Sequence, residues 1–218
     1  MALTKAELVD RVTDNTGRND KDTLILSLLN DALRIVATRH DWLDLYREFE
    51  STLDEDDFRY SFPSDMKTLI GIRLISGTES EWLEERDKRW LMEREPNPDD
   101  ADTEKPWCFA RDGNYWELPA KPDDDYTVYI NYVKWPDDLS NDDDTPDIDQ
   151  IDHVLIEHAT ARLYASLGEF DRAAWWTSEW RRDLKEAIVQ DRSRPGWRPQ
   201  FGESTRHPGS YWLKPEYG

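Results

Sequence analysis

Runs of aspartate are the residues in this sequence with the greatest capacity for chemistry, because clustered carboxylates can bind Ca²⁺ or Mg²⁺. The runs are DEDD at 54–57, PDD at 98–100, DDD at 123–125 and NDDDTPDID at 141–149. The last run lacks the glycine at loop position 6 and the glutamate at position 12 of the helix–loop–helix calcium site. Adjacent aspartates in an extended chain also point in different directions, so few of them converge on one ion. We therefore predict a solvated acidic edge, with no bound metal and no other cofactor.

Two histidines and one cysteine are the other candidates for catalysis. His153 and His158 are five residues apart, so on a helix they project about 140° from each other and do not form the i, i+4 pair of a zinc helix. Cys108, the single cysteine, lies in the segment WCFA without a basic neighbour that would lower its thiol pKa. The sequence contains neither a glycine-rich phosphate loop nor a nucleophile elbow. We predict that the protein is not an enzyme.

The charge of the chain excludes two classes of partner. The 218 residues carry a net charge of −20, which argues against a sequence-reading DNA-binding protein and against attachment to an anionic membrane. Aspartate is abundant and lysine scarce, with 30 Asp and 9 Lys. Adaptation to high salt and functional repulsion of a polyanion both explain this bias. No stretch approaches 18 apolar residues and no apolar leader follows Met1, so we expect a soluble intracellular protein or a particle component assembled inside the cell.

The elements that must position these residues begin with two helices. Thr4-x-x-Glu7 is a capping box, and Leu3 with Leu8 has the spacing of a hydrophobic staple, so a helix begins at Thr4 and ends near Gly17. A second helix is predicted from Asp20 or Asp22 to about His40. Its apolar positions form one broad stripe: Leu24, Ile25, Leu28, Leu29, Ala32, Ile35 and Val36.

Strands are predicted between about residues 45 and 133. The segments 58–63, 68–76 and 126–133 are rich in β-branched and aromatic residues. Residues 107–118 predict a hairpin with Asp112-Gly113 in the turn, in which Trp107 and Trp116 can pair across the strands. A short helix is expected at 85–94. This block is typical of a small antiparallel sandwich or barrel.

Two more helices are predicted after an Asp-rich loop at 136–149. The first begins near Ile151 and ends at Gly168, and the second covers about 170–190 with Trp176 and Trp180 on its packing face. The chain is thus predicted to be an α+β protein, a helical bundle with a β insert. We divide it into 1–44 (N-terminal helices), 45–135 (β-rich insert), 136–192 (C-terminal helices, in one bundle with 1–44) and 193–218 (an extended arm).

The arm differs from the rest of the chain in composition and charge. Residues 193–218 contain four prolines, four glycines and five aromatics, and four cationic side chains against two acidic ones give a net charge of +2. Residues 1–192 have a net charge of −22. Proline and glycine disfavour regular structure, so the arm cannot bury its own aromatics. It either wraps over its own domain or docks onto a partner, and we favour the partner.

The ordered arrangement resembles the head-to-tail adaptor (connector) proteins of tailed viruses over about residues 5–190. The stretches that carry the resemblance are LILSLLNDALRIVATRHDW, YSFPSDMKTLIGI, LPAKPDDDYTVYINYVKWP, and the loop LSNDDDTPDID before the helix that begins IDHVLIEHATARLYASLGEF. This resemblance implies a structural virion protein of the neck, whose subunits form a homo-oligomeric ring, usually of twelve. Such a ring binds the portal protein on one side and a tail or nozzle protein on the other, and genomic DNA passes through it without sequence-specific contact.

The resemblance also implies that the C-terminal arm reaches the portal. On that basis we expect arm residues to dock onto the portal, with aromatics as anchors and arginines as partners of portal carboxylates. They are Arg194, Trp197, Arg198, Phe201, Arg206, Tyr211, Trp212 and Tyr217. Two alternatives stay open: another neck or tail-completion protein, such as a stopper, and an acidic mimic of nucleic acid that sequesters a basic partner.

Overall fold

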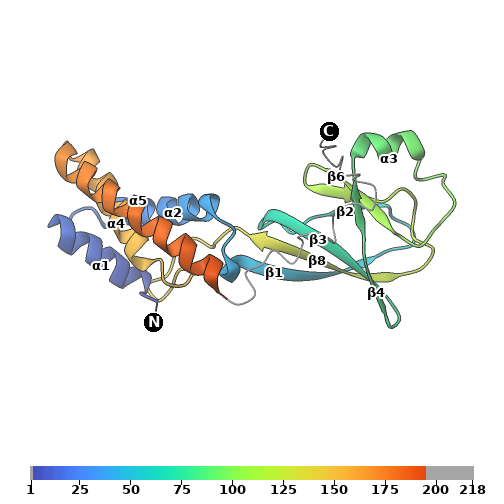
Figure 1. The fold of residues 1–218 in the computed structure, drawn as a ribbon, viewed down its shortest axis with the longest axis horizontal. Helices are drawn as coiled ribbons and strands as arrows, with labels where there is room; N and C mark the ends of the chain where they lie inside the picture. Colours follow the sequence, from blue (N-terminus) through green and yellow to red (C-terminus); the bar gives the residue numbers. More distant parts are fainter. Residues whose placement is uncertain (1, 195–218) are drawn as a thin grey trace, which may run out of the picture. The chain divides into compact units, whose positions relative to one another are not determined.

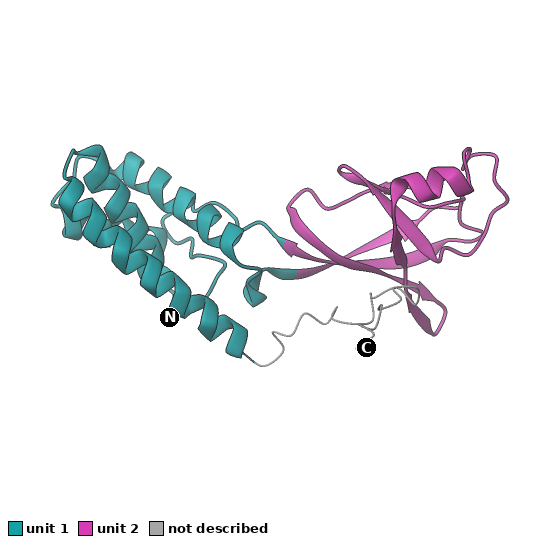
Figure 2. Cartoon of the chain, turned by 45° about the horizontal axis from the view of Figure 1, so that its top comes forward, with its two compact units in different colours: residues 1–46, 134–197 teal, residues 47–133, 198–218 magenta. Residues whose placement is uncertain are grey.

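The computed structural model describes residues 2–194, and these form two compact units (Figure 2). The helical unit comprises residues 2–46 and 134–194 of the described chain, and the β unit comprises residues 47–133. The helical unit is therefore built from two stretches of chain that the β unit separates in sequence.

Four α-helices build the helical unit (Figure 1): α1 (Lys5–Thr16), α2 (Asp22–Arg39), α4 (Asp152–Ser166) and α5 (Phe170–Ser193). A short 3₁₀ helix at Leu43–Leu45 follows α2. The predicted start and stop signals of α1 are confirmed: the Thr4 side chain accepts a hydrogen bond from the Glu7 backbone, and Gly17 ends the helix with φ of 68°. Helix α4 packs against α1, α2 and α5, so it is the centre of the bundle.

The apolar stripe of α2 divides into a buried and a half-exposed line. Ile25, Leu29, Leu33 and Val36 are almost fully buried. By contrast, Leu24 keeps 39% of its surface exposed, and Leu28 and Ile35 are only partly buried. The stripe predicted from the sequence is thus wider than the face that the bundle covers.

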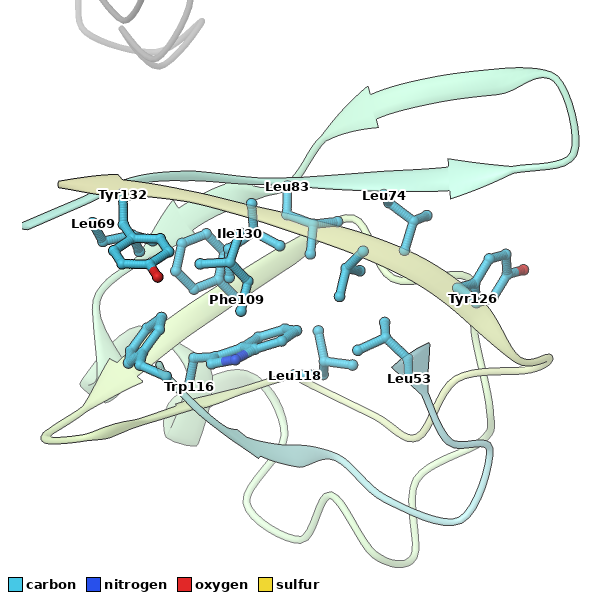
Figure 3. Close-up of a cluster of buried hydrophobic side chains, with 13 residues drawn as sticks. Leu53, Leu69, Leu74, Leu83, Phe109, Trp116, Leu118, Tyr126, Ile130 and Tyr132 are labelled. Atoms are coloured by element: carbon cyan, nitrogen blue, oxygen red, sulfur yellow. The ribbon is translucent and has the colours of Figure 1, made fainter. Parts of the chain in front are cut away.

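Eight strands in two four-stranded sheets and the short helix α3 (Lys88–Arg94) form the β unit. The first sheet has the order β1-β8-β3-β4, with β1 (Tyr46–Leu53), β3 (Met66–Ser76), β4 (Glu79–Trp82) and β8 (Tyr126–Lys134). The second has the order β2-β7-β6-β5, with β2 (Arg59–Ser61), β5 (Glu84–Arg86), β6 (Cys108–Asp112) and β7 (Tyr115–Glu117). Side chains of both sheets meet in one apolar core, in which Phe109 and Trp116 face Ile130 and Tyr132 (Figure 3). With five α-helices and these two sheets, the α+β class is confirmed.

The predicted hairpin forms with a different turn and a different tryptophan pairing. Asp112 pairs with Tyr115, so Gly113 and Asn114 are the turn residues in place of Asp112-Gly113. Gly113 has φ of 62°, which fits the first turn position of a hairpin. The register sets Trp116 opposite Arg111, so the predicted pairing of Trp107 with Trp116 is wrong.

Helix α3 starts later than predicted because the chain first forms an edge strand. Residues Glu84–Arg86 pair with β6 in parallel, a departure from the antiparallel pairing that we expected. The Asp87 side chain then accepts a hydrogen bond from the Arg89 backbone and begins the helix at Lys88. Asp87 is a good N-capping residue, so the helix begins at Lys88 and not at residue 85 as predicted.

Candidate interaction surfaces

Arg194 is the one predicted portal-docking residue within the described part of the chain. It follows α5 directly and caps its C-terminal end. The other seven predicted residues, Trp197, Arg198, Phe201, Arg206, Tyr211, Trp212 and Tyr217, lie outside the described residues. The structure thus describes the base from which the predicted arm starts.

Two carboxylates of the helical unit hold Arg194 in place. Its guanidinium donates two parallel hydrogen bonds to Asp44, of 2.7 and 2.8 Å, and a third of 3.2 Å to Asp191. Hydrogen bonding to Asp44 raises the pKa of Arg194 above its ordinary value. Paired hydrogen bonds from arginine to a carboxylate fix direction as well as charge. The position of residue 194, the last described residue, is therefore fixed on the helical unit.

Asp191 connects this ion pair to the end of α2. Its side chain is only 3% exposed, and its second oxygen lies 2.9 Å from Nε2 of His40 and accepts a 3.3 Å hydrogen bond from the Leu43 backbone. Burial lowers the pKa of His40, although Asp191 opposes that shift. A neutral His40 is therefore expected to donate its Nε2–H to the carboxylate, which can only accept. We name the four side chains His40, Asp44, Asp191 and Arg194 the arm anchor.

Sequence patterns gave no signal for the arm anchor. Asp44 and Arg194 are 150 positions apart, and His40 and Asp191 are 151 apart. Asp44 belongs to no aspartate run, and Asp191 lies in the last turn of α5, beyond the predicted end of that helix near residue 190. Only the tertiary packing of α5 beside the exit of α2 brings these residues together.

The Asp-rich loop at 136–149 is a structured loop that supports the bundle. Asp144 accepts hydrogen bonds of 2.7 Å from the backbones of Ser140 and Asn141, and backbone carbonyls of Asp142 and Asp144 accept from the first N–H groups of α1. Lys134, which is 8% exposed, pairs with Asp137 and Asp147. Part of the predicted acidic edge is therefore used in folding. Within residues 2–194, no group of three or more histidines, cysteines, aspartates or glutamates is placed to hold a metal ion.

The residues considered for catalysis lie apart from one another. Cys108 is buried in the β unit, and burial raises the pKa of its thiol to about 12. In α4, His153 is exposed, whereas His158 is buried with its ring 4.9 Å from that of Trp180, and burial lowers its pKa to about 4. These environments suit structural residues better than a nucleophile and its base.

Glu157 is the strongly shifted acid of the helical unit. Burial, followed by the neighbouring Asp183 and Glu179, raises its pKa to about 7. Asp183 and Glu179 lie on α5, so Glu157 brings a proton-binding group to the contact of α4 with α5. The sequence offered no signal for it, because Glu157 and Asp183 are neither adjacent nor in one element.

A cleft of about 870 Å³ lies in the β unit beside the edge strand β5. Trp82, Trp107 and Phe109 are among the residues that line it. Its cations already have acid partners: Arg86 pairs with Glu84, Lys88 with Glu117 and Arg111 with Glu85. The cleft therefore offers aromatic surface rather than an unpaired charge.

Large apolar side chains are exposed on both units. Three belong to α5: Phe170 is 71% exposed, Trp175 57% and Val189 58%. Others are Leu24 of α2, Trp135 after β8, and Phe49, Trp82, Met92 and Tyr115 of the β unit. A concentration of exposed apolar side chains on one long helix is typical of a surface that another protein covers.

Comparison with known proteins gives the family. No helix among the described residues has the length and apolar character needed to span a membrane. No curated protein matches the sequence. A family model described as SU10 adaptor protein matches residues 3–200, which is nearly the whole chain and includes the stretches from which the adaptor resemblance was drawn. The chain belongs to the SU10 adaptor protein family, a family of phage head–tail adaptors.

Proposed function

We propose that this phage head–tail adaptor works as one subunit of a ring in the virion neck, the twelve-fold ring that the family resemblance implies. In this proposal residues 193–218 dock onto the portal, the β unit faces a tail or nozzle protein, and genomic DNA passes through the ring. The observation that carries the proposal is the family match over residues 3–200. No catalytic step is part of it.

The arm anchor supports the portal-docking role of the arm. A fixed starting point lowers the entropy that a segment loses when it binds a partner, and the bonds from Arg194 to Asp44 and Asp191 provide such a point. The five aromatics and the arginines beyond Arg194 are residue types that dominate binding energy at protein interfaces. Ordering a segment costs roughly 1–2 kcal/mol per residue, and several copies acting together on one portal would offset that cost.

Negative charge supports passage of DNA through the ring. Asp137 and Asp142 in the loop at 136–149 have side chains 79% and 80% exposed. Carboxylates that face a lumen would repel phosphates at close range and let DNA slide without sticking. Acidic loops found on the outer rim of the ring, away from the lumen, would contradict this part of the proposal.

Electron microscopy of the purified protein mixed with portal protein tests the proposal. The full chain is expected to form rings on the portal, and a chain that ends at Arg194 is expected to keep its fold and lose portal binding. The matched point variant is Trp197→Ala with Trp212→Ala, and Met92→Ala in the β unit is the control. Unchanged portal binding after truncation would contradict the arm's role. Binding of a basic protein that survives truncation would favour the nucleic-acid mimic, and a particle with a closed channel would favour a stopper.

A further inference from the structure

Helix α5 presents a line of exposed residues to solvent. Positions 175, 178, 182, 185 and 189 follow one another at intervals of three and four, so they lie along one face. We name Trp175, Ser178, Arg182, Lys185 and Val189 the α5 ridge. Trp175 and Val189 are 57% and 58% exposed at its two ends, and the two cations lie between them.

A groove lies on a different face of the same unit. Leu28, Asp31, Arg34, Ile35, His158 and Arg162 line a hollow of about 330 Å³ between α2 and α4. Leu24, 39% exposed, continues its apolar line by one more helical turn. We name Leu24, Leu28, Asp31, Arg34 and Ile35, together with His158 and Arg162 of α4, the α2 groove. It contains no residue of α5, so the ridge and the groove are both open in one copy.

We infer that the α5 ridge of one copy of this chain seats in the α2 groove of a second copy. This inference rests on the proposed ring and names its subunit contact. The two surfaces complement each other in part: the ridge has cations between its apolar ends, and the groove has Asp31 between apolar residues. Arg34 also lines the groove, but it is already paired with Asp138. Their lengths also agree, because Trp175 to Val189 spans about 21 Å of helix and Leu24 to Ile35 about 17 Å.

Charge favours a second copy as the occupant. Two chains with a net charge of −20 repel each other, so a contact between copies needs local attraction. Helix α5 is the place of least repulsion, since its five cationic side chains balance its five acidic ones, whereas the loop at 137–149 has seven aspartates and no cation. The attraction comes from pairs of opposite charge. Lys185 of the ridge would meet Asp31 of the groove, whereas Arg182 is already paired with Glu179 and Asp183 of its own helix. On α4, Arg162 can pair with Glu186, which follows Lys185 on the entering helix.

The contact joins two different patches, so its geometry is heterologous. Each copy offers a free ridge on one side and a free groove on the other, and repetition of such a contact closes a ring when the rotation between copies permits. A two-fold contact between identical patches would stop at a dimer. Assembly by mixing is therefore a direct test.

Analytical ultracentrifugation of the full chain carries out this test with three variants. The ridge variant is Trp175→Ala with Val189→Asp, the groove variant is Leu24→Asp with Asp31→Lys, and Met92→Asp in the β unit is the matched exposed control. All changed residues are exposed, and circular dichroism checks that each variant is folded. Wild type and control are expected to assemble alike, and each of the other variants to lose about tenfold or more in association constant. An equimolar mixture of ridge and groove variants should give a two-chain species and nothing larger.

A charge exchange locates the contact more closely. Lys185→Asp should weaken assembly, and adding Asp31→Lys to the same chain should restore it, because the opposite charges then meet again with their signs reversed. Assembly of the ridge or groove variant at wild-type strength would overturn the inference, as would failure of the mixture to pair or a wild type that stays monomeric at every concentration. Rings on the portal that persist in both variants would overturn this contact alone and leave the adaptor function standing.

Discussion

Asp191 shows how one buried carboxylate can order a chain terminus. It accepts from His40 and from the Leu43 backbone on one oxygen, and from Arg194 on the other. His40 and Leu43 are 151 and 148 positions away in sequence, and only Arg194 is near, so no local pattern identifies the residue. The sequence did predict that an arm of different composition begins at residue 193, because its content of proline, glycine and aromatic residues can be read locally. The partners that fix Arg194 could not be predicted, since they depend on how helices pack.

Asp191→Ala is expected to destabilise the protein by about 2–3 kcal/mol. The change leaves the buried His40 and the Leu43 backbone without their charged acceptor, and such groups are costly to leave unpaired. Urea unfolding measures the loss. The control is Asp138→Ala, which breaks the exposed pair with Arg34 and should cost less than about 1 kcal/mol. Equal losses in the two variants would contradict the structural role of Asp191.

Neighbouring residues of α4 respond to pH in opposite directions. Glu157 has its pKa raised to about 7, so between about pH 4.5 and 7 the folded protein holds a proton that the unfolded chain has released. Its contribution to stability therefore falls as pH rises through that window. His158 has its pKa lowered to about 4, so between about pH 4 and 6.5 the unfolded chain binds the extra proton and stability rises with pH.

Glu157→Gln and His158→Gln should separate these two effects. Relative to wild type, the free energy of unfolding of the Glu157 variant should rise more steeply with pH between 4.5 and 7. The His158 variant should instead fall more steeply, or rise less, between pH 4 and 6.5. Urea unfolding at a series of pH values measures both slopes, with exposed Glu186→Gln as the control. Curves parallel to wild type in both variants would show that the two groups are not perturbed by folding.

At the scale of elements, helices and strands were predicted well where the sequence contains a specific local signal. The capping box of α1, the glycine ends at Gly17 and Gly168, and the β-rich segments gave helices and strands near their expected places. Strand β5 was missed because its three residues, Glu84–Arg86, are all charged and show no strand pattern. They form a strand only because β6 lies beside them. The order in the Asp-rich loop was missed for the same reason, because Lys5, Asn30 and Lys134 supply its partners from other elements.

Thr4→Ala should test the N-terminal cap of α1. The side chain of Thr4 and that of Glu7 each accept from the other's backbone, and loss of such a cap costs about 1 kcal/mol. Thr23→Ala is the matched control, because Thr23 is an exposed residue in the first turn of α2, a helix without a side-chain cap. Thermal unfolding of both variants measures the difference. A control that loses as much as Thr4→Ala would exclude capping as the cause.

At the scale of the whole molecule, periodicity predicted an α+β protein, because each unit is made of elements that carry their own pattern. The ring, the portal contact and the channel depend on contacts between molecules. A single sequence gives the composition of the contacting surfaces but does not show which residues meet. The division of the chain into 1–44, 45–135, 136–192 and 193–218 stays a prediction. The net charge of −20 is likewise a property of the whole chain, and it opposes compactness wherever salt does not screen it.

The melting temperature is therefore expected to rise with salt. Screening length falls from about 10 Å at 0.1 M to about 3 Å at 1 M, which weakens repulsion among surface carboxylates. Differential scanning calorimetry in increasing NaCl measures the trend. A variant with Asp56, Asp57 and Asp143 changed to Asn has a net charge of −17 and should depend less on salt. A melting temperature that is independent of salt in both proteins would remove high-salt adaptation as an explanation of the acidity.

The divided helical unit has a consequence for synthesis on the ribosome. Helices α1 and α2 are made first, but α4, against which both pack, starts at Asp152, and the carbonyls that complete the start of α1 come from Asp142 and Asp144. Roughly 110 residues separate the end of α2 from α4, which at 5–20 residues per second is a delay of roughly 6–20 s. During that delay the two nascent helices can contact each other but lack α4, while all strands of the β unit emerge. The segment that is translated in the middle can thus fold before the one translated at the beginning, and the nascent helices are where a chaperone would be needed.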